Sequence, residues 1–236
     1  MGKSPSSPNR LLSSLRPADF ELLRPHLKSA ELVHEAVLFE AGDKIDRVYF
    51  PHSGIISLVV ALAGGEAIEA AMIGRDSVYG GSSALDGMVS LNKVIVQLAG
   101  EGVSLDVARL REIADKSLDF RTTLIRHEQV LFAQAQQSAA CNASHTVEAR
   151  LSRWLLRSRD LSGSDTLALT QEFLAQMLGV QRSSVSLVAN TLQQAGLIRY
   201  SRGHIEIINL EGLQDASCEC YRTVKAHYDR LLNHGA

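Results

Sequence analysis

Long apolar runs are absent from the 236-residue sequence, and none approaches the roughly 18–20 residues of a membrane-spanning helix. Residues 1–10 are rich in Ser and Pro and lack the apolar segment of a secretory signal peptide. Cysteine is scarce as well, and the odd set of Cys141, Cys218 and Cys220 fits a reducing compartment. We therefore expect a cytoplasmic protein without a membrane partner, and a disordered tail over residues 1–10.

An excess of basic charge is also missing. The chain has 24 Lys and Arg against 26 Asp and Glu, which gives a formal net charge of −2. The acidic excess lies in residues 1–144, whereas Arg182, Arg199 and Arg202 stand against the single acid Glu172 between residues 170 and 205. Any surface for nucleic acid should therefore be small and local.

Motifs of catalysis are lacking. No segment has the spacing of a Ser-His-Asp set, a P-loop or a metal-ligand cluster, so we expect no enzymatic activity. Cys218-x-Cys220 with His227 could bind a metal or respond to oxidation. Two ligands one residue apart on a helix would point in different directions, however, and no second C-x-C completes a site. We expect structural cysteines and no metal, and redox activity of the pair stays open.

Short β-prone runs fill residues 31–105, and turn residues separate them at intervals of roughly ten residues. This pattern predicts an all-β sandwich or barrel. After Asp106 the strand signals stop, and the sequence predicts a short helix over 107–114 and a longer one from about Leu118. The fold class is therefore α+β.

The longer helix has an apolar stripe that exceeds what one β-domain needs to cover itself. We predict that it packs against a partner helix in a homodimer. The alternative is that it packs on its own β-domain. The predicted interface residues are Phe120, Leu124, Leu131 and Ala135.

Residues 168–198 carry the most specific pattern. Thr170 can cap a short helix that ends at Gly179, where the chain must turn sharply. A second helix with a polar outer face follows and ends at Gly196, which is the order of a helix-turn-helix. Residues 198–207 then alternate around an Arg-Gly turn and predict a basic β-hairpin, a wing. The alternative is an ordinary helical hairpin and β-hairpin that bind nothing.

The sequence resembles the Crp/Fnr family of bacterial transcription regulators over nearly its whole length. The resemblance rests on LFEAGD at 38–43, VYF at 48–50, LTQE at 169–172, RSSVS at 182–186 and GLI at 196–198. It implies a cyclic-nucleotide-binding-like β-roll sensor over 11–116, a dimerisation helix and hinge over 117–144, and a winged helix-turn-helix over 145–236. It also implies a homodimer on a two-fold symmetric double-stranded DNA operator, and RNA polymerase as a partner if the protein activates transcription.

The resemblance assigns DNA contacts residue by residue. Base contacts are implied for Arg182, Ser183 and Ser186, while Leu187 stands where the family commonly has a base-contacting Arg. Base recognition must therefore differ here. Phosphate contacts are implied, or suggested by the basic wing, for Thr170, Gln171, Gln181, Ser184, Arg199, Ser201 and Arg202.

The family's cyclic-nucleotide members hold the phosphate with a Glu and an Arg-Ser pair. Here those positions are Gly81, Leu91 and Asn92, so the sequence argues against cyclic AMP. The family's iron–sulfur mode is also excluded, because no cysteine precedes Cys141. We expect an unknown effector, or none, and no cofactor. The alternatives are a cyclic nucleotide bound through substituted residues such as Arg75, or an interaction module without DNA recognition. Candidate pocket residues are Glu66, Glu69, Arg75, Tyr79, Gly80, Gly81, Ser82, Leu91 and Asn92.

Overall fold

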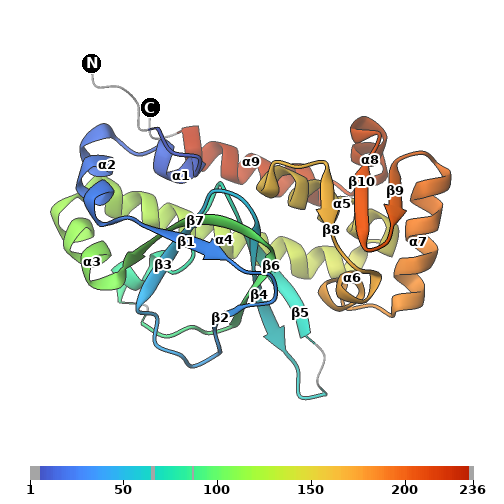
Figure 1. Cartoon of the computed structure of the whole chain (residues 1–236), viewed down its shortest axis with the longest axis horizontal. Helices are drawn as coiled ribbons and strands as arrows, with labels where there is room; N and C mark the ends of the chain where they lie inside the picture. Colours follow the sequence, from blue (N-terminus) through green and yellow to red (C-terminus); the bar gives the residue numbers. More distant parts are fainter. Residues whose placement is uncertain (1–5, 65–66, 87, 234–236) are drawn as a thin grey trace.

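The computed structural model describes residues 6–64, 67–86 and 88–233. A β-domain, a long helix and a C-terminal helical domain follow one another along the chain, and this confirms the predicted α+β fold (Figure 1). No helix in this described part is long and apolar enough to span a bilayer.

The β-domain contains two antiparallel sheets. One has the order β1-β7-β3 and the other β2-β6-β4-β5. The strands are β1 (Lys28–Leu32), β2 (Val37–Phe39), β3 (Arg47–Pro51), β4 (Ile55–Ala61), β5 (Ala67–Ile73), β6 (Lys93–Leu98) and β7 (Gly100–Asp106). Helical segments around them are α1 (Arg10–Ser13), α2 (Pro17–Leu23), η1 (Arg24–His26), η2 (Gly81–Leu85) and α3 (Val107–Lys116).

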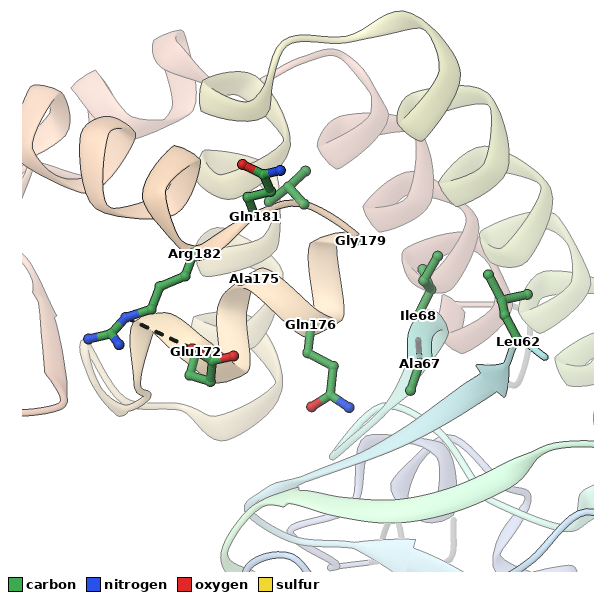
Figure 2. A pocket seen from close by; sticks show the side chains of 10 residues that line it. Leu62, Ala67, Ile68, Glu172, Ala175, Gln176, Gly179, Gln181 and Arg182 are labelled. Atoms are coloured by element: carbon green, nitrogen blue, oxygen red, sulfur yellow. Dashed lines mark ion pairs between the residues drawn. The ribbon is translucent and has the colours of Figure 1, made fainter. Parts of the chain in front are cut away.

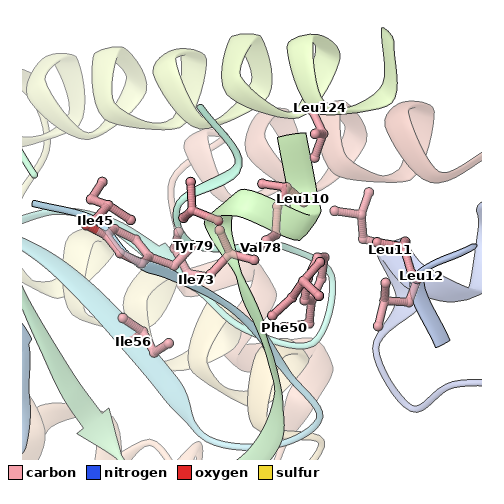
Figure 3. Packing of buried hydrophobic residues seen from close by; sticks show 14 of the residues in the cluster. Leu11, Leu12, Ile45, Phe50, Ile56, Ile73, Val78, Tyr79, Leu110 and Leu124 are labelled. Carbon is pink, nitrogen blue, oxygen red and sulfur yellow. The ribbon is translucent and has the colours of Figure 1, made fainter. Parts of the chain in front are cut away.

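The core of the β-domain lies between the sheets and the helices that cover them. Inward residues of the strands, such as Phe50 and Ile56, belong to one buried cluster with Leu110 of α3 and Leu124 of the long helix (Figure 3). Burial of these apolar side chains is the main stabilising contribution here. The long helix is therefore part of this domain's core.

The ordered part of the chain begins before residue 11, the predicted start of the β-roll domain. Asn9 is fully buried, its side-chain amide donates to the carbonyls of Pro51 and Ser77, and its Oδ1 accepts from Leu12 N at the start of α1. The predicted disordered tail therefore does not extend to Asn9 and Arg10, because Asn9 is buried with three hydrogen-bond partners and Arg10 begins α1. Residues 1–5 of that prediction lie outside the described residues.

The long helix is α4 (Leu118–Ser144), and Ser117 caps it by accepting from Phe120 N. One face of α4 is buried against its own chain along its length, from Phe120 and Leu124 to Ser138 and Cys141. α9 (Cys220–Asn233) runs back beside α4 (Figure 1). Val224 and Tyr228 of α9 join the core of the β-domain. Thus α9, the last helix of the predicted C-terminal domain, packs on the N-terminal β-domain.

A second core joins the C-terminal domain to the β-domain. It includes Leu155, Leu174, Val185 and Ile205 together with Ile55, Val59, Met72 and Leu98 of the β-strands. The elements of the C-terminal domain are α5 (Val147–Ser162), β8 (Thr166–Ala168), α6 (Gln171–Leu178), α7 (Arg182–Gln194), β9 (Ile198–Ser201), β10 (His204–Ile207) and α8 (Leu210–Ala216), followed by α9. The three strands form a small antiparallel sheet of order β8-β10-β9.

Candidate nucleic-acid interface

The turn between α6 and α7 has the geometry that the sequence predicts. Thr170 Oγ1 accepts from Phe173 N at 3.2 Å and caps α6. Gly179 has φ +63°, so Val180 N can reach the carbonyl of Ala175 at 3.0 Å. A Cβ on Gly179 would also lie 3.1 Å from Ile68 Cδ1 of the β-domain. Two requirements, the left-handed turn and the close neighbour, therefore favour glycine here.

The helix α7 buries Val185, Ala189 and Leu192 and turns its other side to solvent. Its first turn contains no acidic residue, and Gln181 at the N-cap makes no side-chain hydrogen bond there. The free N–H groups and the positive end of the helix dipole therefore face solvent, where an anion can approach.

Arg182 stands at this end of α7. Its side chain is 67% exposed, and its Nε lies 3.9 Å from Glu172 Oε2 of α6, an ion pair that Figure 2 shows as a dashed line. An exposed pair at that distance contributes little free energy. Arg182 is therefore free to exchange Glu172 for another partner.

Ser186 and Gln171, predicted for base and phosphate contact respectively, meet each other. Ser186 Oγ donates to Gln171 Oε1 at 2.5 Å and also lies 3.0 Å from the carbonyl of Arg182. This contact joins the start of α6 to α7. Ser183 and Gln181 are exposed beside Arg182, and Ser184 is half-buried. The exposed face also includes Leu187.

The hairpin of β9 and β10 forms the predicted wing. Its two turn residues, Arg202 and Gly203, have φ of +48° and +78°, which is the type I′ geometry of a tight hairpin. Arg199 stands opposite Glu206 across the strands, with Nη1 2.7 Å from Oε2. Arg202 and Ser201 are exposed at the tip. In the described part of the chain, Arg202 has no acidic partner within ion-pair distance.

The β4–β5 hairpin approaches the start of α7 from the other side. A groove of about 820 Å³ separates Leu62 and Ile68 of the β-domain from Gln176, Gln181 and Arg182. In Figure 2 the two apolar side chains lie on one side of this groove, and the Arg182–Glu172 pair lies on the other. Direct contact between the β-domain and the helix-turn-helix lies beside this groove, where Ile68 of β5 packs next to Gly179 at the end of α6.

A pocket of about 620 Å³ lies between η2 and α4 in the β-domain. Of the predicted pocket residues it includes Tyr79, Gly80, Ser82, Leu91 and Asn92. The charged side chains in its lining are Asp86 and Glu128, both acidic. Glu128 was missed from sequence, because α4 brings it to the pocket from far along the chain. Asp86 is paired with Arg111 at 3.0 Å, so Glu128 is the lining residue whose charge opposes a bound phosphate.

Three of the predicted pocket residues lie elsewhere. Glu69 is buried against α5, where its Oε1 accepts from Trp154 Nε1 at 2.9 Å. Arg75 reaches toward Gly163 of the C-terminal domain. Gly81 borders Glu128 and Leu124 but does not line the cavity. The backbone geometry of the turns and strands directs these three residues away from the pocket. Their positions in the sequence alone do not show this direction. Glu66 lies outside the described residues.

The predicted dimer-interface residues face their own chain. Phe120 and Leu124 are 1% exposed in the core of the β-domain, Leu131 lines the pocket and Ala135 is half-buried. The assignment of Phe120 and Leu124 to a partner surface is therefore wrong, since the stripe covers the chain's own core. A different stripe of α4 is exposed, with Leu118, Ile125 and Phe132 at intervals of seven residues.

The cysteines also differ from expectation. Cys218 lies in the turn before α9 and only Cys220 lies in the helix, so both sulfur atoms can point to one place. They meet Cys141 and His145 there. His227, the expected neighbour, instead lines a groove with Arg126 of α4. Burial raises the pKa of the Cys218 thiol to about 12. The missed signal was Cys141-x-x-x-His145, one helical turn apart.

Comparisons with known proteins agree with this geometry. A model of the Crp-like helix-turn-helix domain matches residues 149–216. The chain is 27% identical over 198 residues to the transcriptional regulator SdrP of Thermus thermophilus, which covers 78% of this chain and 94% of SdrP.

Solved structures show the same fold. FixK2 from Bradyrhizobium japonicum matches with a TM-score of 0.68 and 16% identity, over 81% of this chain and 98% of FixK2. A CRP/FNR-family transcriptional regulator from Thermus thermophilus matches with a TM-score of 0.65 and 20% identity, over 80% and 98% of the two chains. The helix-turn-helix region therefore matches the Crp-like helix-turn-helix domain, and the chain as a whole is similar to a transcriptional regulator and has the fold of CRP/FNR-family structures.

Proposed function

We propose that this chain is a Crp/Fnr-type transcription regulator that binds a two-fold symmetric DNA operator as a homodimer, with α7 in the major groove and Arg182 as its main base contact. One observation carries the proposal. The N-terminal end of α7 is free of acids and presents Arg182 between short polar neighbours, next to an exposed wing.

Base recognition centres on Arg182. Its ion pair with Glu172 is long and exposed, so the guanidinium can turn to the O6 and N7 of a guanine. Ser183 is short and exposed beside it, which lets the helix approach the base edges. Leu187 is 69% exposed and suits contact with a thymine methyl group. Ser186 acts mainly by holding Gln171 in place.

Phosphate contacts surround this centre. The positive end of α7 and the exposed Gln181 contact the phosphate backbone of one DNA strand in this arrangement. Arg202 at the wing tip contacts the phosphate backbone next to the major groove that α7 enters. Arg199 contributes less, because Glu206 already neutralises it. The remaining candidates are Thr170, Gln171, Ser184 and Ser201.

The exposed stripe of α4 supports the dimer. Leu118 and Phe132 are 77% and 65% exposed, and with Ile125 they repeat every seven residues. A heptad stripe of this kind packs against the same stripe of a second copy. Two recognition helices then face half-sites about one turn of DNA apart.

The pocket of the β-domain suits an uncharged or cationic small ligand. Its lining is largely apolar, and Glu128 repels phosphate, whereas the charge of Asp86 is compensated by Arg111 at 3.0 Å. Glu128 lies on α4, so a ligand there would act on the helix that we propose forms the dimer. A sensor that binds no effector is the second candidate, because the pocket already has the internal hydrogen bond from Tyr79 Oη to Ser90 Oγ.

Selection on random duplex DNA tests the proposal. We expect a two-fold symmetric site from the wild-type chain. Arg182→Ala should lower specific affinity by about 1–3 kcal/mol and relax the preference at one base pair of each half-site. The matched control Arg202→Ala should lower the affinity for all DNA sequences alike. It should also reduce the slope of log affinity against log salt concentration by about one. An Arg182→Ala variant with unchanged sequence preference would contradict the base contact, and an asymmetric site would contradict the dimer.

A further inference from the structure

Four metal-ligand side chains converge where α4 ends and α9 begins. The sulfur atoms of Cys141, Cys218 and Cys220 and a ring nitrogen of His145 all lie within 4.8 Å of one another. We infer that these four residues form a zinc site of the Cys3His type. The site is separate from the DNA-binding face and from the pocket of the β-domain.

The distances fit tetrahedral zinc. Zn–S bonds of about 2.3 Å and Zn–N bonds of about 2.0 Å place the ligand atoms roughly 3.5–3.8 Å apart. Cys141 Sγ lies 3.5 Å from Cys218 Sγ, and Cys220 Sγ lies 3.6 Å from His145 Nδ1. Two opposite edges of the tetrahedron are therefore already at the required length.

Outer contacts orient the ligands as metal sites require. His145 presents Nδ1 to the cluster, while its Nε2 lies 3.3 Å from Glu219 Oε1. A carboxylate on the far nitrogen fixes the tautomer and makes the imidazole a better ligand. Gln137 Nε2 donates to Cys220 Sγ at 3.0 Å, a contact that favours a thiolate.

Charge balance also supports a divalent cation. Three thiolates and one zinc ion leave a net charge of about −1. The guanidinium groups of Arg150 and Arg153 lie close enough to interact electrostatically with Cys141. They can compensate the remaining charge in a site where all three cysteines are buried.

Zinc accounts for all four residues, whereas a disulfide does not. A bond between Cys141 and Cys218 would need their sulfur atoms at about 2.05 Å and an oxidant, and would leave Cys220 and His145 without a role. A closed tetrahedral set rich in thiolates is typical of structural zinc, which needs no redox partner.

The position of the site suggests what the metal does. Cys141 belongs to the last turns of α4, His145 is its C-cap, and the other two ligands precede and begin α9. Zinc would therefore tie the hinge between the long helix and the DNA-binding domain to the C-terminal helix. Binding at such a site adds directly to folding stability.

Metal analysis of the full-length chain, purified under reducing conditions and dialysed against zinc, is the direct test. We expect about one zinc per chain and no bound iron, as a single Cys3His site requires. Cys220→Ser should lose most of the zinc, and the control His227→Ala should keep it. Wild-type chain without zinc, or Cys220→Ser with full zinc, would overturn the proposal, as would a wild-type chain that retains iron instead.

Two further measurements keep the test decisive if Cys220→Ser folds poorly. Cobalt in place of zinc should give tetrahedral d–d bands and thiolate-to-metal charge-transfer absorption, and their absence would contradict the site. Glu219→Gln changes a mostly exposed side chain and should weaken zinc affinity about tenfold or more. Unchanged affinity would contradict the role of Glu219. None of these measurements involves DNA, so their failure is distinct from failure of the proposed function.

Discussion

Two buried carboxyl groups at the boundary between the β-domain and α5 are held in opposite ways. Asp76 pairs with a charged partner, Arg157, whose Nη1 lies 2.7 Å from Oδ2. Glu69 has neutral partners: Trp154 donates to it at 2.9 Å, and Ser57 Oγ lies 2.6 Å from its Oε2. The two carboxyls are only 2% and 9% exposed.

The pKa values diverge as a result. Burial alone would raise the pKa of Asp76, but Arg157 lowers it below its ordinary value. Burial raises the pKa of Glu69 to about 7, because the hydrogen bonds from Ser57 and Trp154 and the more distant charges of Arg153 and Arg157 oppose the shift only in part. A direct ion pair, which Asp76 forms with Arg157 and Glu69 lacks, therefore decides, more than the depth of burial, which carboxyl is ionised at neutral pH.

Removing the charged partner should have the largest effect. Arg157→Met leaves Asp76 buried without a counter-ion, and we expect the free energy of unfolding at pH 7 to fall by about 3–5 kcal/mol. Urea denaturation of the full chain measures it. Adding Asp76→Asn should recover part of the loss, because no buried charge then remains. The control Arg159→Met removes more exposed ion pairs on the same helix and should cost under about 1 kcal/mol. An equal loss in both single variants would contradict the comparison.

Raising the pH from 5 to 8 should ionise Glu69 but leave the charge of Asp76 unchanged. Its pKa is higher in the folded chain than in the unfolded one, so its contribution is complete below about pH 4.5 and is lost as pH rises through about 7. We expect the free energy of unfolding to fall by up to about 3 kcal/mol between pH 5 and pH 8 from this group. Asp76 has the opposite sign, and its contribution is lost only in acid.

Glu69→Gln isolates this effect. The variant cannot ionise at that position, so its stability should depend less on pH than that of the wild type, while other titrating groups contribute equally to both. Urea denaturation across the pH range gives the difference. Parallel curves for the two proteins would show that Glu69 does not titrate near neutrality.

Local pattern explains what was predictable from sequence. Thr170 acts through its side-chain cap on the next turn, and Gly179 and the Arg202-Gly203 turn act through their backbone conformation, so the helix-turn-helix and its wing were confirmed where they were expected. The alternation of short strands likewise identified the β-domain. In these places the chain's conformation depends on residues close in sequence.

Long-range placement explains what was not predictable. The apolar periodicity of α4 predicts a helix, but only the folded chain shows that Phe120 and Leu124 cover its own core and Phe132 does not. Glu69 and Arg75 were expected in a ligand pocket, whereas contacts with α5 and Gly163 direct them to the domain boundary. Cys141 and Cys218 meet only because α9 returns along α4.

The smallest effect should come from weakening one neutral contact of Glu69. Ser57→Ala removes a hydroxyl 2.6 Å from the carboxyl, and we expect a loss of about 1 kcal/mol in the free energy of unfolding. Ser57 also lowers the pKa of Glu69, so the midpoint of the pH dependence should move upward in the variant. The control Ser152→Ala removes a buried hydroxyl that has no hydrogen-bond partner among the described residues, and it should leave the midpoint in place. A midpoint unchanged in Ser57→Ala would contradict the contribution of the Ser57 hydroxyl to the pKa of Glu69.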